Sequence, residues 1–190
     1  MNALSWVMPA AVCGLITDEG VDTSYTVSCE EPVYVGTGEA DRAAWIPAAF
    51  YARPDTDVCV RVLRAWKMRS QPALMSEFGA ALQFFEGFGE NWSALEGCLP
   101  YMDEWLPVSV YILVVERAEE MLADEPGEMP AFLRVMDRVG KFWSAAVTDG
   151  DRFDRPPIPF HVLLHFSENM EGPIAAMRSI ASRAEIAIRV

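Results

Sequence analysis

The stretch "LQFFEGFGENWSALEGCLPYM", residues 82–102, decides how the middle of this 190-residue chain folds. Gly87 and Gly89 allow a sharp turn, because glycine adopts positive φ angles without a steric penalty. Asn91 suits an N-cap position, since its side-chain oxygen can accept a hydrogen bond from a backbone amide of the first helical turn. Pro100 stops or kinks a helix. The stretch therefore predicts a tight loop followed by a short helix that begins after Asn91 and ends near Pro100.

The predicted short helix has two different sides. We expect its apolar side to be buried, and that side consists of Trp92, Leu95, Cys98 and Leu99. We expect its opposite side to face solvent, and that side consists of Ser93, Glu96 and Gly97.

Three apolar runs around this stretch predict strands. They are "VCVRVLRAW" (58–66), "PVSVYILVV" (107–115) and "IPFHVLLHF" (158–166). In the first run Val58, Val60 and Val62 share one face, and Arg61 on the other face indicates partial exposure. The second run is continuously apolar, as expected for a parallel strand that is covered on both faces.

Helices are predicted between and after these strands. Ser70 is a suitable N-cap with Pro72 in the first turn, and residues 128–146 form the clearest helix, with Pro130 in its first turn. A last helix is expected around 174–181, with a short strand in 184–190. The order of strand, helices, strand, helix and strand predicts an α/β fold with a small parallel sheet. The apolar positions of the three main helices are Leu74, Phe78, Ala81 and Leu82; Phe132, Val135, Met136, Val139 and Trp143; and Ile174, Met177, Ile180 and Ala181.

The first 54 residues differ from the rest. They contain the turn signals "TDEG" (17–20) and "GTGEAD" (36–41) around the β-prone runs "SYTVS" (24–28) and "PVYVG" (32–36). We therefore predict a β-rich N-terminal extension, residues 1–54, and a main domain, residues 55–190.

Composition narrows the classes of function. Hydrophobic residues make up 52% of the chain and charged residues 23%, which is typical of a folded domain with a sizeable core. The net charge is −13, and such a field repels the phosphate backbone of nucleic acids. It attracts a basic protein partner and accelerates encounter with it. We therefore expect that the protein does not bind nucleic acid. We expect any protein partner to be basic.

Cysteine usage and hydropathy predict a cytoplasmic protein. Cys13, Cys29, Cys59 and Cys98 are widely spaced among apolar neighbours, which is typical of reduced, mostly buried thiols, and a Cys13–Cys29 disulfide stays open as an alternative. The first apolar segment has no preceding Lys or Arg, so we do not assign it as a signal peptide. No apolar run approaches the roughly 20 residues that span a bilayer, and no membrane contact is expected.

Candidate catalytic and metal-binding residues are few. His161 and His165 lie four apart in a predicted strand, which separates their side chains by roughly 13 Å, too far to share one metal ion. Asp149, Asp151 and Asp154 resemble the start of a calcium loop without its later ligands, and a solvated loop is the expected structure. No phosphate-binding glycine motif or nucleophile elbow occurs. We therefore predict neither a metal nor a cofactor, and no enzymatic activity.

Residues 86–130 carry most of the negative charge. This segment holds eleven acidic residues and a single basic one, Arg117. A solvated face that favours solubility and a binding surface for a basic protein both fit this pattern. Charge alone leaves the two interpretations open.

The segment "FGENWSALEGCL", residues 88–99, resembles a pattern of the barstar family, the intracellular inhibitors of the ribonuclease barnase and its relatives. The pattern is aromatic-Gly-Glu-Asn-x-x-Ala-Leu-x-x-Cys-Leu, and the order of predicted elements from residue 55 to residue 166 agrees with that family. The resemblance implies a small three-stranded parallel sheet packed with helices. The matching positions are Gly89, Glu90, Asn91, Ala94, Leu95, Cys98 and Leu99.

The resemblance also implies a binding surface. In that family the loop and the exposed face of the second helix plug the ribonuclease active site, and acidic side chains imitate substrate phosphates. The positions of the family's key aspartates are Ser93 and Gly97 here, the aromatic position between them is Glu96, and the loop tyrosine position is Gly87. Negative charge at this surface would come from neighbouring acids instead. The expected partner-binding residues are Glu86, Gly87, Phe88, Glu90, Ser93, Glu96 and Gly97.

Three functional hypotheses follow. The first is a bacterial inhibitor or immunity protein that occludes a basic partner, a ribonuclease or another nuclease toxin. The second is a non-inhibitory interaction module on a barstar-like scaffold, which the missing aspartates favour. The third, a small enzyme, rests only on His161, His165 and the Asp-rich loop.

Overall fold

The computed structural model describes residues 57–150, 154–167 and 169–188, together with the backbone of three short strands nearer the N-terminus. Those strands are β1 (Ile16–Thr17), β2 (Gly20–Val21), which pairs antiparallel with β1, and β3 (Val33–Thr37). The run 24–28, Cys13, Cys29 and Asp151 lie outside the described residues. The later elements are β4 (Val58–Arg64), α2 (Gln71–Leu82), α3 (Trp92–Cys98), β5 (Val110–Glu116), α4 (Met129–Ser144), β6 (Phe160–Phe166) and α5 (Glu171–Arg183), with 3₁₀ helices at Ala65–Lys67, Leu99–Glu104, Ala118–Glu120 and Pro126–Glu128.

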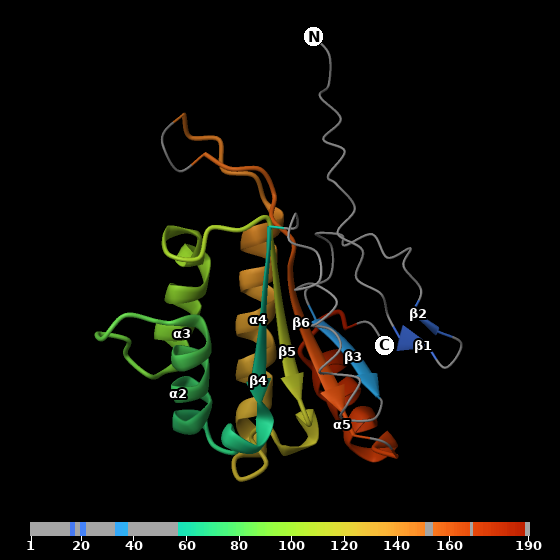
Figure 1. The fold of residues 1–190 in the computed structure, drawn as a ribbon. Helices are drawn as coiled ribbons and strands as arrows, with labels where there is room; N and C mark the ends of the chain where they lie inside the picture. The colour runs from blue at the N-terminus through green and yellow to red at the C-terminus, as the bar shows by residue number, and fades with distance from the viewer. Residues whose placement is uncertain are drawn as a thin grey trace.

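A parallel sheet organises the fold. Its strand order is β3-β6-β5-β4, with Val60 opposite Ile112 and Leu113 opposite Val162 in the registers. The predicted α/β fold is confirmed, and β4, β5 and β6 are the three predicted parallel strands (Figure 1). β3 adds a fourth strand beside β6 and comes from the first 54 residues. The domain boundary at residue 55 stays a prediction.

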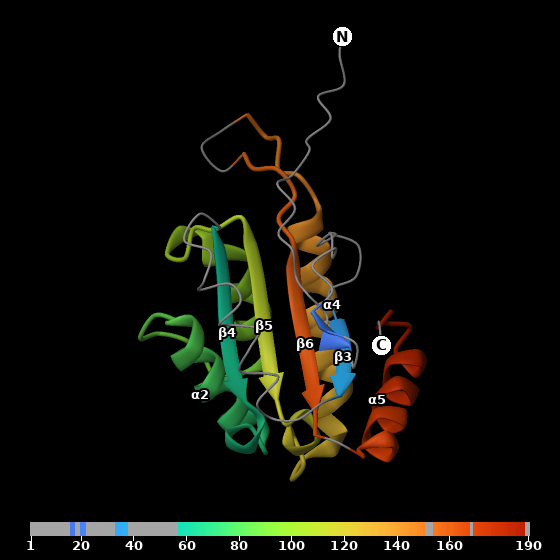
Figure 2. The same ribbon diagram turned by 45° about the vertical axis from the view of Figure 1, so that its right-hand side comes forward.

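The helices and one face of the sheet share the main core. Figure 2 shows α4 behind β5 and β6, with α2 and α5 at the two flanks. Alternate residues of each strand, such as Leu63, Leu113 and Val162, are fully buried in this core. The predicted stripe of α4 is confirmed, since all five of its members are buried: Phe132, Val135, Met136, Val139 and Trp143.

Trp143 lies at the centre of this core. Its side chain is fully buried, its ring centroid is 5.0 Å from that of Tyr111, and its indole N–H donates to the Leu99 carbonyl at 3.3 Å. The Arg155 guanidinium lies 4.4 Å from the Trp143 ring centroid, in cation–π geometry. Trp143 therefore joins α4 to the sheet, to the segment after α3 and to the segment before β6.

The second face of the sheet holds a smaller cluster and both histidines. Val60, Val110, Ile112 and Val114 are buried there, with Val58, Val62 and Leu163 packed against them. His161 and His165 alternate with the core residues of β6, and each is only 7% exposed. Both lie in a strand, as predicted, and the structure shows that both are buried.

The burial of His165 predicts that the stability of the fold depends on pH. Burial lowers the pKa of its imidazole, although the nearby Glu116 and Glu119 act in the opposite direction. The neutral form is therefore favoured in the folded state, and the unfolded state binds a proton first as the pH falls below about 6.5. We expect the contribution of His165 to the free energy of unfolding to be fully present above that pH. It should decrease between about pH 6.5 and 5.5, by up to about 1.4 kcal/mol per pH unit.

Urea unfolding at the two ends of this window checks the prediction. The variant His165→Gln should show a smaller decrease than the wild type, because its side chain does not titrate. Carboxylates of ordinary pKa stay ionised throughout the window and do not confound the comparison. Equal decreases in the two proteins would assign the pH dependence to other groups.

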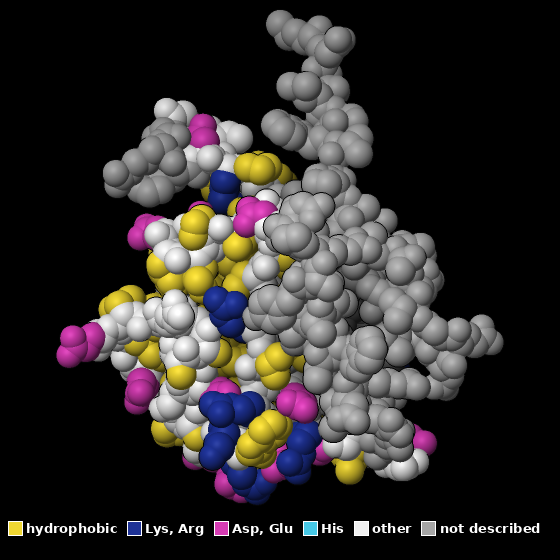
Figure 3. Space-filling view, viewed as in Figure 1, with side chains coloured by type: hydrophobic (Ala, Val, Ile, Leu, Met, Phe, Trp, Pro, Cys, Tyr) yellow, Lys and Arg dark blue, Asp and Glu magenta, His cyan; other side chains and the backbone are white. Residues whose placement is uncertain are grey.

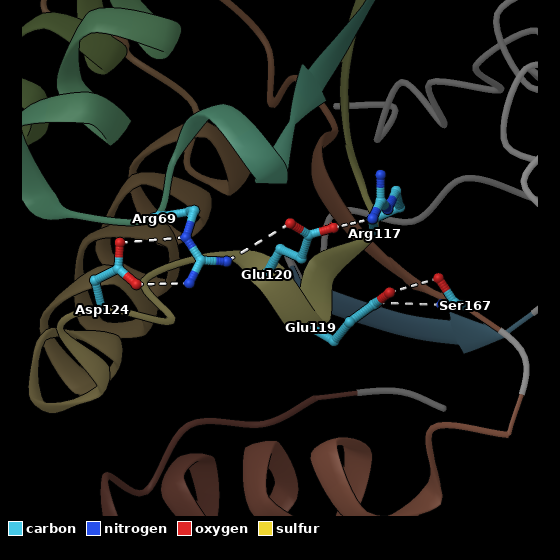
Figure 4. A network of polar contacts seen from close by, with 6 residues as sticks. All are labelled: Arg69, Arg117, Glu119, Glu120, Asp124 and Ser167. Atoms are coloured by element: carbon cyan, nitrogen blue, oxygen red, sulfur yellow. Dashed lines mark hydrogen bonds and ion pairs between the residues drawn. The ribbon is translucent and has the colours of Figure 1, made fainter.

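A polar network joins the segments that follow β4, β5 and β6 (Figure 4). Arg69 donates to Asp124 at 2.6 and 3.2 Å and lies 3.6 Å from Glu120. Glu120 is also ion-paired with Arg117. Arg69, Arg117, Glu120 and Asp124 thus crosslink the turns at the carboxyl ends of β4 and β5. Beside them, the turn after β5 is joined to the end of β6. There Ser167 donates to Glu119 through its backbone N–H, at 3.2 Å, and through its hydroxyl.

Two local predictions need correction. Ser70 occupies the N-cap position of α2, but its side chain makes no capping hydrogen bond; only its carbonyl takes part, accepting from Leu74 N–H at 2.9 Å. Within residues 184–188 there is no strand. The N–H of Ile186 instead donates to the Ala181 carbonyl at 3.0 Å, and the Ile186 side chain packs into the core as α5 ends.

Candidate partner-binding surface

The loop at residues 83–91 connects α2 to α3 and protrudes from the body of the protein (Figure 1). α2 ends because Gln83 adopts a left-handed conformation, with φ of 58°, and its N–H donates to the Gly79 carbonyl. The Asn91 side chain orders the other end of the loop. Its oxygen accepts from Ala94 N–H at 2.9 Å and its amide donates to the Gly89 carbonyl at 2.7 Å. The predicted N-cap of α3 is confirmed.

The glycines of the loop serve a purpose different from the predicted one. Glu90 has φ of 43°, whereas neither Gly87 nor Gly89 has a positive φ. A Cβ at Gly87 would lie 3.2 Å from the Phe85 ring, and a Cβ at Gly89 would lie 3.2 Å from the Asn91 amide nitrogen. The glycines are therefore explained by close approach of side chains, and the turn itself is made at Glu90.

Glu90 also attaches the loop to α2. Its backbone carbonyl accepts from the Gln71 side chain at 3.1 Å, and its carboxylate accepts from the Ser76 hydroxyl at 3.5 Å. These contacts hold an exposed loop in one position and reduce the entropy that binding a partner would otherwise cost.

Removing the cap of α3 should loosen this loop. We expect Asn91→Ala to lower the free energy of unfolding by about 1 kcal/mol, because Ala94 N–H and the Gly89 carbonyl lose their partner. Urea unfolding measures the loss, and hydrogen exchange at the Ala94 amide should accelerate. Ser93→Ala, at the neighbouring exposed position, is the matched control and should change stability by less than about 0.5 kcal/mol. Equal effects of the two substitutions would contradict the capping role.

Aromatic side chains support the loop from beneath. The Phe84 ring centroid lies 4.7 Å from that of Phe88 and 6.1 Å from that of Trp105. The Trp105 indole N–H donates to the Leu82 carbonyl at 2.9 Å, which fixes the end of α2 against the 3₁₀ helix Leu99–Glu104. Phe88, predicted to face a partner, is half-buried in this support.

An open groove of about 710 Å³ lies between the loop and the segment that follows α3. Phe85 and Tyr101 at this groove are 60% and 58% exposed, unusual values for large aromatic side chains. Figure 3 shows hydrophobic and acidic side chains together on the protruding loop. The groove is lined by Phe85, Gly87, Gly89, Ala94, Gly97, Cys98, Tyr101, Glu104 and Trp105.

The exposed side of α3 carries little charge of its own. Ser93 and Gly97 are exposed, and a Cβ at Gly97 would meet no atom within 4 Å. Glu96 is ion-paired with Arg138 of α4 at 3.0 Å, through both carboxylate oxygens. On the buried side, the Trp92 indole N–H donates to Glu128 at 2.7 Å. Glu96 therefore joins α3 to α4, and its charge is not free as the sequence suggested.

The acidic residues of the segment 86–130 fall into two groups, those bonded to other parts of the protein and those with free carboxylates. Glu119, Glu120, Asp124 and Glu128 bond to other parts of the protein. In the described part of the chain, Glu86 and Glu104 have no ion-pair or hydrogen-bond partner. Figure 3 shows a cluster of Lys and Arg side chains at the lower end of the molecule, where β4 and β5 end, with single basic groups elsewhere on this face. In the same view the protruding loop lies away from that basic cluster.

The structure brings some of the predicted site residues together and separates others. Gly87 and Gly97 line the groove, while Glu86, Glu90 and Ser93 are exposed on the loop and on α3. Phe88 supports the loop, and Glu96 faces Arg138. The sequence reasoning missed Phe85, Tyr101, Glu104 and Trp105. The sequence held no clear signal for them, because Pro100 ends the predicted helix before Tyr101, and the 3₁₀ helix Leu99–Glu104 does not repeat the spacing of an α-helix.

Metal sites and membrane spans are absent from the part of the chain that the structure describes. Over residues 57–150, 154–167 and 169–188, no three His, Cys, Asp or Glu side chains lie close enough to hold a metal ion. Over the same ranges, no helix is both long and apolar enough to cross a bilayer. Cys59 and Cys98 are buried free thiols, and burial raises the pKa of both.

Comparison with known proteins gives a family match. The model of the family described as Barstar (barnase inhibitor) matches residues 58–165, more than half of the chain. No curated protein matches. A solved structure of the ORC2 protein of Aeropyrum pernix, in ADPNP-ADP complexes, is 11% identical, with a TM-score of 0.45. The alignment covers 84% of this chain and 40% of that one, and a likeness at this level carries no argument about function.

Proposed function

The chain belongs to the barstar family, and from this premise we propose that it is an inhibitor or immunity protein that binds and occludes a basic partner, a ribonuclease or another nuclease toxin. It would act by occlusion, not by catalysis. A cytoplasmic site of action is part of the proposal and is supported by the two buried free thiols.

One observation carries the proposal most directly. The loop and α3, within the family match, form an exposed surface that is held in place by Asn91, Glu90 and the aromatic support beneath it. A protruding, pre-organised surface with exposed aromatic side chains is typical of a protein interface. The net charge of −13 and the free carboxylates Glu86 and Glu104 favour a basic partner.

The alternative is a non-inhibitory interaction module on the same scaffold. It is favoured by Ser93 and Gly97, which leave the exposed side of α3 without the acidic side chains that the family's inhibitors use. On this alternative the surface binds a protein without blocking an active site. The two candidates predict the same complex and differ in whether the partner's activity is lost.

Capture from native lysate, followed by mass spectrometry, identifies the partner. We expect a nuclease that forms a 1:1 complex, loses its activity in that complex and binds more weakly as salt rises. A complex with a partner that keeps full activity would favour the interaction module.

Charge reversal tests the surface in that complex. We expect Glu86→Lys and Glu90→Lys each to weaken binding by about tenfold or more, because each places a positive charge against a basic partner. Glu96→Lys should also weaken binding, although part of its effect is the lost ion pair with Arg138. Glu171→Lys, in the first turn of α5, is the control and should leave affinity within about twofold. If the loop variants behave like the control, the surface is wrongly assigned.

A further inference from the structure

Small residues make the surface of the loop and α3 concave. A surface that plugs a partner's active site would instead project there. Three glycines and Ala94 line the groove, and Gly97 leaves open space where any other residue would project a side chain. The groove exists because these side chains are small, and it is continuous with the loop and α3. The partner must therefore supply the projecting group at this point.

Two exposed aromatic side chains lie at this space. Phe85 comes from the loop and Tyr101 from the 3₁₀ helix Leu99–Glu104, and each is more than half exposed. Trp105 adds a third aromatic side chain, which the hydrogen bond to the Leu82 carbonyl holds in place. Aromatic faces bind planar cations as well as apolar groups.

One carboxylate also lines the groove. Glu104 is exposed, and in the described residues its carboxylate has neither an ion-pair nor a hydrogen-bond partner. A second acidic residue, Glu86, is exposed on the loop, and it also has no hydrogen-bond or ion-pair partner in the described chain. A groove that carries aromatic side chains together with a free carboxylate differs from a purely apolar docking site.

We propose that this groove receives an arginine side chain of the basic partner, with the guanidinium stacked on Phe85 and Tyr101 and paired with Glu104. The inference rests on the proposed function for the existence of a basic partner. Arginine fits better than lysine because its planar guanidinium both stacks on aromatic rings and forms two parallel hydrogen bonds to a carboxylate. An apolar side chain would bury Glu104 without a partner, which is unfavourable.

At this point the surface of this protein and the surface of its partner exchange the roles that they have in the family's plug-like binding. This protein supplies the socket and the partner supplies the inserted side chain, while the negative charge comes from the segment after α3 in place of α3 itself. Glu104 takes the place of the charge that Ser93 and Gly97 lack.

Short peptides test the groove without the partner. The probes are N-acetyl-Gly-Arg-Gly-amide, the same peptide with citrulline as a neutral isostere, and the same peptide with lysine or leucine. Binding is followed by the NMR shifts of the Trp105 indole N–H and of the Gly87 and Gly97 amides. We expect saturable shifts with the arginine peptide, in the millimolar range, and binding about tenfold weaker with citrulline. Equal or tighter binding of the leucine peptide, or no saturable shift with arginine, overturns the proposal.

Variants locate the contacts. Glu104→Gln should weaken arginine binding by about fivefold to tenfold and remove the preference over citrulline, and Tyr101→Leu should weaken it similarly. Glu171→Gln and Phe142→Leu are the matched controls outside the groove and should leave binding unchanged. Equal effects of Glu104→Gln and Glu171→Gln would mean that the peptide responds only to net charge.

The captured nuclease separates this inference from the proposed function. Unchanged affinity of the nuclease for Glu104→Gln and Tyr101→Leu would overturn the arginine groove and leave the inhibitor proposal intact. Arginine-peptide binding in the groove with no nuclease captured would overturn the inhibitor proposal and support the groove.

Discussion

Trp143→Ala is expected to lower the free energy of unfolding by about 3–5 kcal/mol, because Trp143 is the largest of the fully buried side chains in the described residues. The indole is fully buried, and its removal would leave a cavity between α4, Tyr111 and the segment after α3. The Leu99 carbonyl would lose its donor, and the Arg155 guanidinium would lose the ring beneath it. Urea unfolding followed by circular dichroism measures the loss, and the thermal midpoint should fall by about 2–4 °C per kcal/mol.

Phe142→Ala is the matched control for Trp143→Ala. The two aromatic residues are adjacent in α4, and their rings are 5.7 Å apart, but Phe142 is 41% exposed. Its removal should cost less, about 1–2 kcal/mol, since a large part of its surface already faces water in the folded protein. A cost at Trp143 no larger than that at Phe142 would contradict the placement of Trp143 at the centre of the fold.

Gly97→Trp is expected to weaken the complex with the partner by about 100-fold or more, while the protein stays folded. The new ring would fill the groove and project from the exposed side of α3, where a partner must make close contact. Stability should not fall, because a Cβ at Gly97 meets no atom within 4 Å and glycine is a poor residue in a helix. Isothermal titration with the captured nuclease measures the affinity, and urea unfolding measures the stability.

Gly172→Trp serves as the control for Gly97→Trp. Gly172 also has open space around an added Cβ, but it lies in the first turn of α5 and outside the groove. Its substitution should leave affinity within about twofold of the wild type. A partner that still binds the Gly97→Trp variant tightly would place the interface on another face of the protein.

Local patterns predicted most of the fold. The continuous apolar run of β5, the stripe of α4 and the cap at Asn91 each act through neighbours in sequence, so periodicity and residue type were sufficient. β3 was predicted as a β-prone run, but its parallel pairing with β6 could not be. That pairing joins segments far apart in the chain, and nothing in either segment alone specifies its partner.

The candidate surface was predicted less completely. The sequence pointed to the loop and α3, where residues close in sequence are close in space. It assigned a free charge to Glu96, which the structure pairs with Arg138, a residue far along the chain on α4. It also missed the groove, because Phe85 and Tyr101 become neighbours of one cavity only when the 3₁₀ helix after α3 is placed beside the loop. Exposed aromatic residues cannot be told from buried ones by residue type.

The activity of the captured nuclease, measured against increasing amounts of this protein, tests the central claim most directly. The claim is that the loop and α3 occlude a basic nuclease. We predict that one equivalent of wild-type protein abolishes the nuclease activity and that the same amount of Gly97→Trp leaves it nearly intact. Full activity at saturating wild-type protein, or equal inhibition by both proteins, would contradict the claim.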